Sequence, residues 1–284
     1  FFYPGKAITQ TGGHGDMRRK DFFEPCGCAY SGNITQVVDG PIAMRKAIRE
    51  EFRKGANQIK IFLSGGVSTN LAPLEMPHFS DEEISAAVDE ANRRNSYVMA
   101  HCHTDEGANR CVDLGVRSIE HGSLIKENTA KRIKENNVYV VPTLSAGELI
   151  ADRAKELGLE DDTLKKVKEV NSYRDKAIEY CSKAGVKMGL GCDLHGHENL
   201  KTQGRELWLR GQIQKPIEVL RSATTINAEI IQMKNRLGAI KEDAFADLLI
   251  IKGDPLKDLS IFIHSEENIL LLIKDGEIKN SRLN

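Results

Sequence analysis

The sequence lacks long hydrophobic runs and any excess of charge of one sign. No apolar stretch approaches the roughly 20 residues that a membrane-spanning helix needs, so we expect no membrane segment. The 284 residues carry 40 Lys+Arg against 41 Asp+Glu, a formal net charge of −1. A nearly neutral chain has no electrostatic reason to bind nucleic acid or an anionic membrane surface. We therefore expect neither nucleic acid nor a membrane as a partner.

Cysteine is sparse and shows neither a zinc-ribbon nor a disulfide pattern. The six cysteines lie far apart except for Cys26 and Cys28, and no zinc-ribbon spacing is present. A chain of this length does not need disulfides to fold. We expect free thiols, with Cys26 and Cys28 in a structural loop rather than a redox site. Free thiols favour a reducing compartment such as the cytoplasm.

An initiator methionine and a signal peptide are also absent, because the sequence begins Phe1-Phe2-Tyr3-Pro4. We interpret the sequence as a piece of a longer protein. Its compartment cannot then be read from the N-terminus.

Short β-rich runs alternate with amphipathic helical stretches between about residue 55 and residue 193. Repeated strand–helix units predict a parallel sheet with helices outside it. Helices are expected at 41–54, 81–95, 108–114 and 127–135, with two more inside 148–184. The six expected strands are 6–11, 58–65, 97–103, 118–122, 139–144 and 186–193.

These units predict an α/β fold, a (β/α)8 barrel of the TIM type with about six of its eight strands present. The C-terminal region differs, because a helix pair at 216–232 precedes short apolar runs at 246–252 and 269–274. Asp275-Gly276 is typical of a tight turn between strands. We expect residues 1–235 to form the partial barrel and residues 236–284 to form the C-terminal part of a small β-sandwich.

Metal-competent side chains occur on successive expected strands, namely Lys60, His101, His103, His121 and Asp193. Each has an ordinary structural explanation by itself. A lysine can extend to solvent, a histidine can be hydrogen-bonded in a core, and an aspartate can cap a helix. In a (β/α) barrel, however, the carboxyl ends of the strands meet at one mouth. Their joint occurrence there predicts a metal site.

The motifs around these residues resemble the amidohydrolase superfamily. They are IKIFLSGG at 59–66, AHCH at 100–103, IEHG at 119–122 and GCD at 191–193. The tail adds SATTINA at 222–228, LGAI at 237–240, ADLL at 246–249 and GDP at 253–255. Three further motifs, QTGGHGD at 10–16, PCGC at 25–28 and KMGLGCDL at 187–194, are most similar to the imidazolonepropionase-related group. That group contains Xaa-Pro dipeptidases, metal-dependent carboxypeptidases, ochratoxin-type amidases, and carbamate or urea-herbicide hydrolases.

The resemblance implies a hydrolase with two divalent metal ions, zinc being the first candidate. Lys60 matches the family's lysine that carbon dioxide carboxylates and that bridges both ions. His101 and His121 match the histidines that bind the second ion. Asp193 matches the aspartate that binds the first ion and handles the proton. By this resemblance a metal-bridging hydroxide attacks the amide carbonyl, and Asp193 passes a proton to the leaving amine.

Two further histidines are candidates for contacts with the substrate. The resemblance places His14, from the GGHGD motif, near the substrate carbonyl or carboxylate, in a catalytic and substrate-binding role. The period of two along a strand turns His103 inward with His101 and turns Cys102 towards the helices. We therefore expect His103 to contact substrate rather than metal. The expected specificity segments are the βα loops 67–77, 145–150 and 194–201.

The sequence departs from the family pattern in one respect. The His-x-His motif of the first barrel strand is absent, and so are barrel strands 1 and 2. We expect an open sheet with exposed edges and an incomplete site for the first metal ion. On this interpretation the sequence is a fragment of the working enzyme or an inactive piece.

The resulting hypothesis is a binuclear metal-dependent amidohydrolase that cleaves the amide bond of dipeptides or N-acyl amino acids, similar to Xaa-Pro dipeptidases and carboxypeptidases. One alternative is a hydrolase of aryl amides, carbamates or cyclic amides of the imidazolone type. Another is a catalytically incomplete barrel that only binds a ligand or partner. The expected partner is a small molecule or a dipeptide. A homo-oligomer is compatible with the sequence, which does not determine the oligomeric state, the metal or the substrate side chain.

Overall fold

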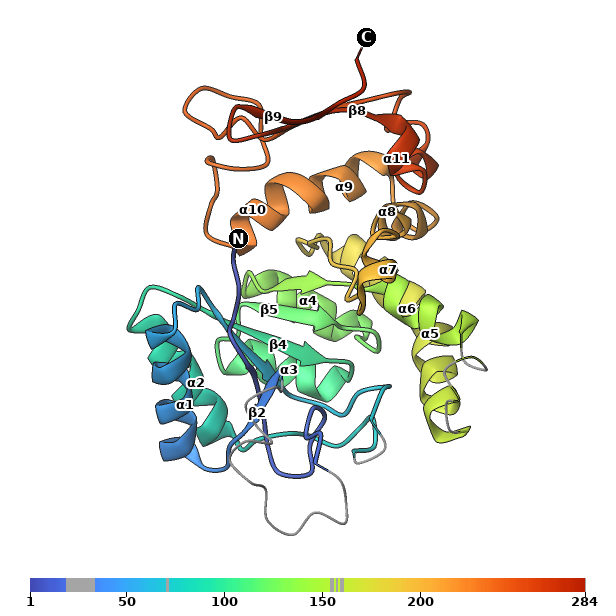
Figure 1. The fold of residues 1–284 in the computed structure, drawn as a ribbon. Helices are drawn as coiled ribbons and strands as arrows, with labels where there is room; N and C mark the ends of the chain where they lie inside the picture. Colours follow the sequence, from blue (N-terminus) through green and yellow to red (C-terminus); the bar gives the residue numbers. More distant parts are fainter. Residues whose placement is uncertain (19–33, 70–71, 154–155, 157, 159–160, 284) are drawn as a thin grey trace.

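The computed structural model describes residues 1–18, 34–69, 72–153, 156, 158 and 161–283, and Figure 1 shows their arrangement. Six parallel strands form one sheet in the order β2-β1-β3-β4-β5-β6. The strands are β1 (Ala7–Thr9), β2 (Thr35–Val37), β3 (Ile59–Phe62), β4 (Val98–Cys102), β5 (Ser118–His121) and β6 (Tyr139–Val141).

Helices follow the strands and cover the sheet, as the alternating pattern predicted. Their apolar sides pack with the sheet residues into one large buried cluster. The helix after β3 begins at the expected capping box, in which Ser80 and Glu83 exchange side chain–backbone hydrogen bonds. The helices are α1 (Pro41–Arg53), α2 (Asp81–Asn92), α3 (Asp105–Asp113), α4 (Glu127–Glu135), α5 (Leu144–Asp152) and α6 (Asp161–Ala184).

The C-terminal part contains short helices and a second, antiparallel sheet. The helices are α7 (His197–Leu200), α8 (Gly204–Gly211), α9 (Pro216–Arg221), a π-helical turn (Ser222–Ile226) and α10 (Asn227–Ile230). The sheet, of order β7-β8-β9, lies across α9 and α10 from the large sheet (Figure 1). Its strands are β7 (Leu248–Ile251), β8 (Ile269–Lys274) and β9 (Glu277–Ser281), with a 3-10 turn (Leu259–Phe262) and α11 (Ser265–Asn268) between β7 and β8.

The prediction of a strand over 186–193 is wrong in extent, because only a single bridge, between Val140 and Met188, forms there. The side chain of Asn227 accepts a hydrogen bond from the N–H of Leu190 and donates one to its carbonyl oxygen. Arg210 donates to the carbonyl oxygen of Gly189. Side chains therefore satisfy the backbone groups that a strand would use, and glycines weaken strand pairing further.

Two other expectations need correction. The sixth strand of the sheet is β2 (three residues), which the sequence did not predict. The segment 145–150, expected in a loop, lies inside α5, because its apolar residues recur at helical spacing. In the parts of the chain that the structure describes, no helix combines the length and the hydrophobicity that crossing a bilayer requires.

Candidate active site

Three histidines meet at the carboxyl ends of β4 and β5. One ring nitrogen from each of His101, His103 and His121 lies within 4.8 Å of the others. The ring centroids are 4.5 Å apart for His101 and His121 and 4.7 Å apart for His103 and His121. The His14 ring, from the loop after β1, lies 4.4 Å from that of His101. The structure thus brings together four histidines from three separate segments of the chain.

Strand register explains why most of these side chains share one side of the sheet. His101 pairs with Phe62 on β3 and with Glu120 on β5, and register partners in a parallel sheet point the same way. Lys60 lies two residues before Phe62 and so points the same way. Cys102 has the opposite direction, since a Cβ on Gly107 of α3 would come within 2.5 Å of its sulfur. The expected alternation of inward and outward residues is confirmed on this strand.

His121 and Asp193 reach the site through unusual backbone conformations. Alternation alone would direct His121 outward, because it pairs with Cys102. Instead His121 has φ 74° and Asp193 has φ 49°, in the left-handed region that residues with a Cβ rarely adopt. Such strain persists where the surrounding structure enforces it, and it is frequent at functional sites.

Acidic groups and a lysine surround the histidines. Burial lowers the pKa of Lys60, while the negative charges of Glu120 and Asp193 oppose this shift. Burial likewise raises the pKa of Glu120 and of Asp193, opposed in each by the charge of Lys60. The Asp193 side chain is 47% exposed and lies 3.7 Å from Nε2 of His195, so its free surface faces the cavity.

The cluster histidines favour the neutral form. Burial, reinforced by His103, His78, Lys60 and Lys166, lowers the pKa of His14 to about 3. Burial also lowers the pKa of His103 to about 4. The pKa values of His101 and His121 fall well below the ordinary value for the same reason. A neutral imidazole has a free lone pair, which is the form that binds a metal ion.

Neighbouring groups hold the histidine rings in place. Nδ1 of His121 hydrogen-bonds to Oγ1 of Thr143 at 2.6 Å, and Nδ1 of His103 to Oγ of Ser123 at 3.1 Å. Partners of this kind fix the tautomer and orientation of metal-binding histidines. Nδ1 of His14 is buried without a hydrogen-bond partner. The neutral imidazoles of His101 and His121, which line one cavity with the Asp193 carboxylate, fit a divalent metal ion with nitrogen and oxygen ligands.

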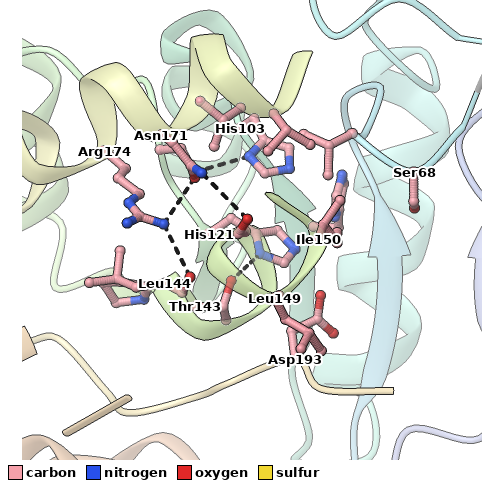
Figure 2. A pocket seen from close by; sticks show the side chains of 18 of the residues that line it. Ser68, His103, His121, Thr143, Leu144, Leu149, Ile150, Asn171, Arg174 and Asp193 are labelled. Carbon is pink, nitrogen blue, oxygen red and sulfur yellow. Dashed lines mark hydrogen bonds between the residues drawn. The ribbon is translucent and has the colours of Figure 1, made fainter. Parts of the chain in front are cut away.

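The histidine cluster and Asp193 line one side of a cavity of about 280 Å³ (Figure 2). His14, His101, His103, His121 and Asp193 all contribute to its wall. The opposite side is formed by α5 and α6, with Thr143 at the start of α5 (Figure 2). The cavity is therefore bounded by the metal-competent cluster and by a pair of helices.

Most sequence candidates converge here, while a few do not. His195 lines the cavity, but His197 lies outside it and is 86% exposed. Val67 and Ser68 of the first expected specificity segment line the cavity. Among the described cysteines, Cys102, Cys111, Cys181 and Cys192 are free thiols. The Cys26-Gly-Cys28 segment lies outside the described residues.

Sequence reasoning missed several groups at the site. Glu120 was not a candidate, although its pairing with His101 places it on the inward face. The period of two applied across β4 and β5 could have found it. Thr143, Ser123, Asn171 and Arg174 gave no comparable signal, because their roles depend on contacts between segments that are separate in the sequence.

Comparison with curated proteins gives a relative of known activity. Ochratoxinase from Aspergillus niger is 29% identical over 268 residues, which cover 91% of this chain and 55% of that protein. The chain therefore spans about half the length of this curated relative. The crystal structure of A. niger ochratoxinase is 26% identical to this chain in sequence, with a TM-score of 0.86, over 99% of this chain and 66% of that one.

Solved structures of other hydrolases are also similar. A prolidase complexed with N-methylphosphonate-L-proline is 42% identical with a TM-score of 0.94, over 99% of this chain and 69% of that one. A Xaa-Pro dipeptidase with bound methionine in its active site is 30% identical with a TM-score of 0.85, over 99% of this chain and 68% of that one. The Amidohydrolase family matches residues 7–279. This chain is a member of the amidohydrolase family, with relatives that include prolidases and ochratoxinase.

Proposed function

We propose that this chain carries the active site of a binuclear metal-dependent hydrolase that cleaves the amide bond of dipeptides or N-acyl amino acids. The observation that supports this most directly is the convergence of His101, His103 and His121 on a cavity that Asp193 also lines. The similarity to a prolidase and to a Xaa-Pro dipeptidase favours a substrate with a free carboxylate next to the scissile amide.

The proposed metal ligands are Lys60, His101, His121 and Asp193. Burial lowers the pKa of Lys60, which favours the uncharged amine that reaction with carbon dioxide requires, and the carbamate offers two oxygen ligands. Bound divalent ions, zinc being the first candidate, supply positive charge that polarises a carbonyl and lowers the pKa of water. Because the His-x-His motif of the first barrel strand is absent from the sequence, a complete two-ion site requires ligands in addition to these four.

The remaining site residues have roles in proton transfer and substrate contact. The Asp193 carboxylate, which lines the cavity, is the proposed carrier of a proton to the leaving amine nitrogen. His14 and His103 are the proposed contacts for the substrate carbonyl or carboxylate. Ser123 and Thr143 hold the rings of His103 and His121 in the required orientation.

The first test measures metal content per chain by elemental mass spectrometry, on protein purified with bicarbonate present. We expect about two divalent ions where the site is complete. Labelled bicarbonate should give a carbamate signal by NMR that Lys60→Met lacks. Absence of both metal and carbamate would contradict the proposed site.

A dipeptide library then tests the substrate class, with C-terminal amides of the same peptides as the comparison. Cleavage of the free acids but not of the amides supports the proposal. The similarity to ochratoxinase supports a second candidate, a hydrolase of an aryl amide, carbamate or cyclic amide, and equal cleavage of acids and amides favours it. A protein that binds ligand without cleaving any amide would instead be the non-catalytic barrel.

A further inference from the structure

The cavity wall opposite the histidines is mostly apolar. Two consecutive helices, α5 and α6, contribute most of it, and Figure 2 shows Leu149 and Ile150 of α5 near the histidine cluster. Val167 and Val170 of α6 also line the cavity and are nearly fully buried, at 2% and 6% exposure. This part of the cavity offers dispersion contacts and little hydrogen bonding.

The cations at this wall already have negatively charged partners. Arg174 forms an ion pair with Glu148 and donates to the carbonyl oxygen of Leu144 at 3.1 Å. Arg153 makes two hydrogen bonds to the Glu156 carboxylate, at 2.9 Å and 2.6 Å. Neither of these two arginines, among the described residues that line the cavity, therefore has an unpaired positive charge that could bind a negatively charged substrate side chain.

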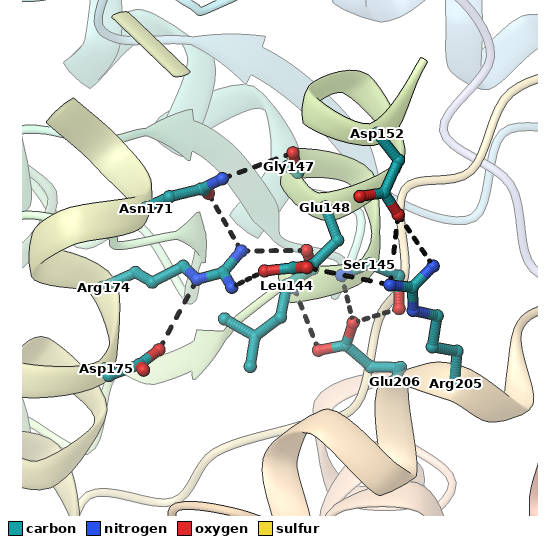
Figure 3. A network of polar contacts seen from close by, with 10 residues as sticks. All are labelled: Leu144, Ser145, Gly147, Glu148, Asp152, Asn171, Arg174, Asp175, Arg205 and Glu206. Carbon is teal, nitrogen blue, oxygen red and sulfur yellow. Dashed lines mark hydrogen bonds and ion pairs between the residues drawn. The ribbon is translucent and has the colours of Figure 1, made fainter. Parts of the chain in front are cut away.

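The polar side chain of Asn171 is also engaged. Its oxygen accepts a hydrogen bond from Arg174 at 2.9 Å, and its amide nitrogen donates to the carbonyl oxygen of Gly147 at 3.4 Å. A Cβ on Gly147 would lie 2.6 Å from that Asn171 oxygen, so α5 and α6 approach closely at this point. Figure 3 shows the resulting polar network behind the wall. The wall is held in one arrangement before any ligand binds.

We propose that the space between α5, α6 and the histidine cluster is a subsite for a bulky apolar side chain, branched aliphatic or aromatic, on one of the two groups that the amide joins. This inference rests on the proposed function. A charged side chain against α5 and α6 would lose its hydration without gaining an unpaired counter-charge from that wall. The cavity volume of about 280 Å³ lies at the small end of ligand pockets, which suits a substrate of dipeptide size.

The test compares kcat/KM across dipeptides in which each position in turn is Ala, Leu, Phe, Asp or Lys. At one of the two positions, Leu and Phe should exceed Ala by about tenfold or more, and Asp and Lys should fall below Ala. Equal values across the series at both positions would overturn the subsite.

Val170→Thr tests the wall itself, because threonine keeps the shape of valine and adds a hydroxyl group. We expect the Phe-to-Ala ratio of kcat/KM to fall several-fold in this variant. Val112→Thr is the matched control, since Val112 is 7% exposed, also lies in a helix, and does not line the cavity. An unchanged ratio in Val170→Thr, or the same fall in both variants, would contradict the proposal.

Direct binding separates failure of the subsite from failure of the proposed function. Calorimetry with N-acetyl-L-phenylalanine and N-acetyl-L-aspartate needs no turnover. If no amide is cleaved, the proposed function fails. The subsite is still supported where the phenylalanine compound binds at least about tenfold more tightly than the aspartate compound and Val170→Thr weakens it. Equal affinities, or no binding of either compound, overturn the subsite.

Discussion

Individual residues at the cavity adopt conformations that the rest of the chain mostly avoids. His121 and Asp193, with φ 74° and 49°, both occupy the left-handed region, which costs roughly 1–3 kcal/mol for a residue other than glycine. A fold retains such strain where surrounding contacts enforce it. The contact from Thr143 to His121 at 2.6 Å is one of these. The strain supports a role for both side chains in the cavity.

Asp193→Asn keeps the shape of this side chain and removes its charge and its capacity to carry a proton. We expect kcat to fall by roughly 10²–10⁴-fold, with a loss of bound metal. Steady-state kinetics and elemental analysis of the same preparation measure both effects. Asp243→Asn is the matched control, because Asp243 also has positive φ, 64°, and is exposed. Equal activity of the two variants would exclude Asp193 from the chemistry.

Residue types and spacing were sufficient to predict much of this cluster. The sequence placed His101, His121 and Asp193 at strand ends, and the structure brings them to one cavity. Glu120 was missed because a single carboxylate between Ile119 and His121 shows no ligand spacing by itself. The sequence directed both His101 and His103 inward but assigned only His101 to the metal. In the structure their rings lie 4.9 Å apart, and both contribute a nitrogen to the same cluster as His121.

Glu229 in α10, which does not line the cavity and contacts Tyr139 at the start of β6, links acidity to stability. Hydrogen bonds and charge from Lys187 and Lys234 lower the pKa of Glu229 to about 2, with contacts of 2.5 Å and 2.7 Å. A depressed pKa contributes stability above the ordinary glutamate pKa, and this contribution is lost as the pH falls from about 4.5 towards 2. In urea unfolding at several pH values, Glu229→Gln should be less stable than the parent at pH 7. This difference should shrink as the pH falls towards 3, and a constant difference would contradict the linkage.

At the scale of elements, the site depends on where α5 begins. The buried carboxylate of Glu206, from α8, accepts hydrogen bonds from the N–H groups of Leu144 and Ser145 and from the hydroxyl of Ser145, at 3.1, 2.7 and 2.7 Å (Figure 3). A carboxylate at a helix N-terminus satisfies N–H groups that have no partner within the helix. Thr143, the residue before α5, contacts His121. Glu206 thus connects α8 to the orientation of a candidate metal ligand.

Glu206→Ala should therefore lower the free energy of unfolding by roughly 2–4 kcal/mol, since it leaves buried donors without an acceptor. Glu206→Gln should cost less, because its amide oxygen can still accept. Glu218→Ala, at an exposed position in α9, should change stability by less than about 0.5 kcal/mol. Urea unfolding of the three variants checks the order, and equal losses for Glu206→Ala and Glu218→Ala would contradict it.

Element predictions succeeded where the pattern was local and failed where side chains replaced backbone pairing. The helix 127–135 and the strand 269–274 have the expected bounds, because periodicity and turn residues determine both. The segment 186–193 has the apolar residues of a strand. Asn227, however, forms hydrogen bonds of 3.0 Å and 2.9 Å with the backbone of Leu190. A contact 37 residues away along the chain leaves no periodic signal in the segment itself.

At the scale of the whole molecule, the site joins several elements of the sheet. Lys60 comes from β3, His101 and His121 come from the ends of β4 and β5, and Asp193 comes from the segment after Met188. The fold class was predictable because strand–helix alternation allows few architectures. The order of the strands in the sheet was not predictable, because β2, which the sequence did not predict, forms one edge of the sheet beside β1.

A metal ion bound by residues from these elements should stabilise the entire fold, because ligands that bind only the native state shift the unfolding equilibrium. Removal of metal with a chelator should lower the midpoint of thermal unfolding, by an amount equivalent to about 2.7 kcal/mol when the free ion had been at a hundredfold excess over Kd. Added zinc should restore the midpoint in the parent but not in His101→Gln. His197→Gln, altered at an exposed histidine outside the cavity, should behave like the parent. If chelation of protein that is shown to contain metal leaves the midpoint of thermal unfolding unchanged, the ion is bound outside this cluster.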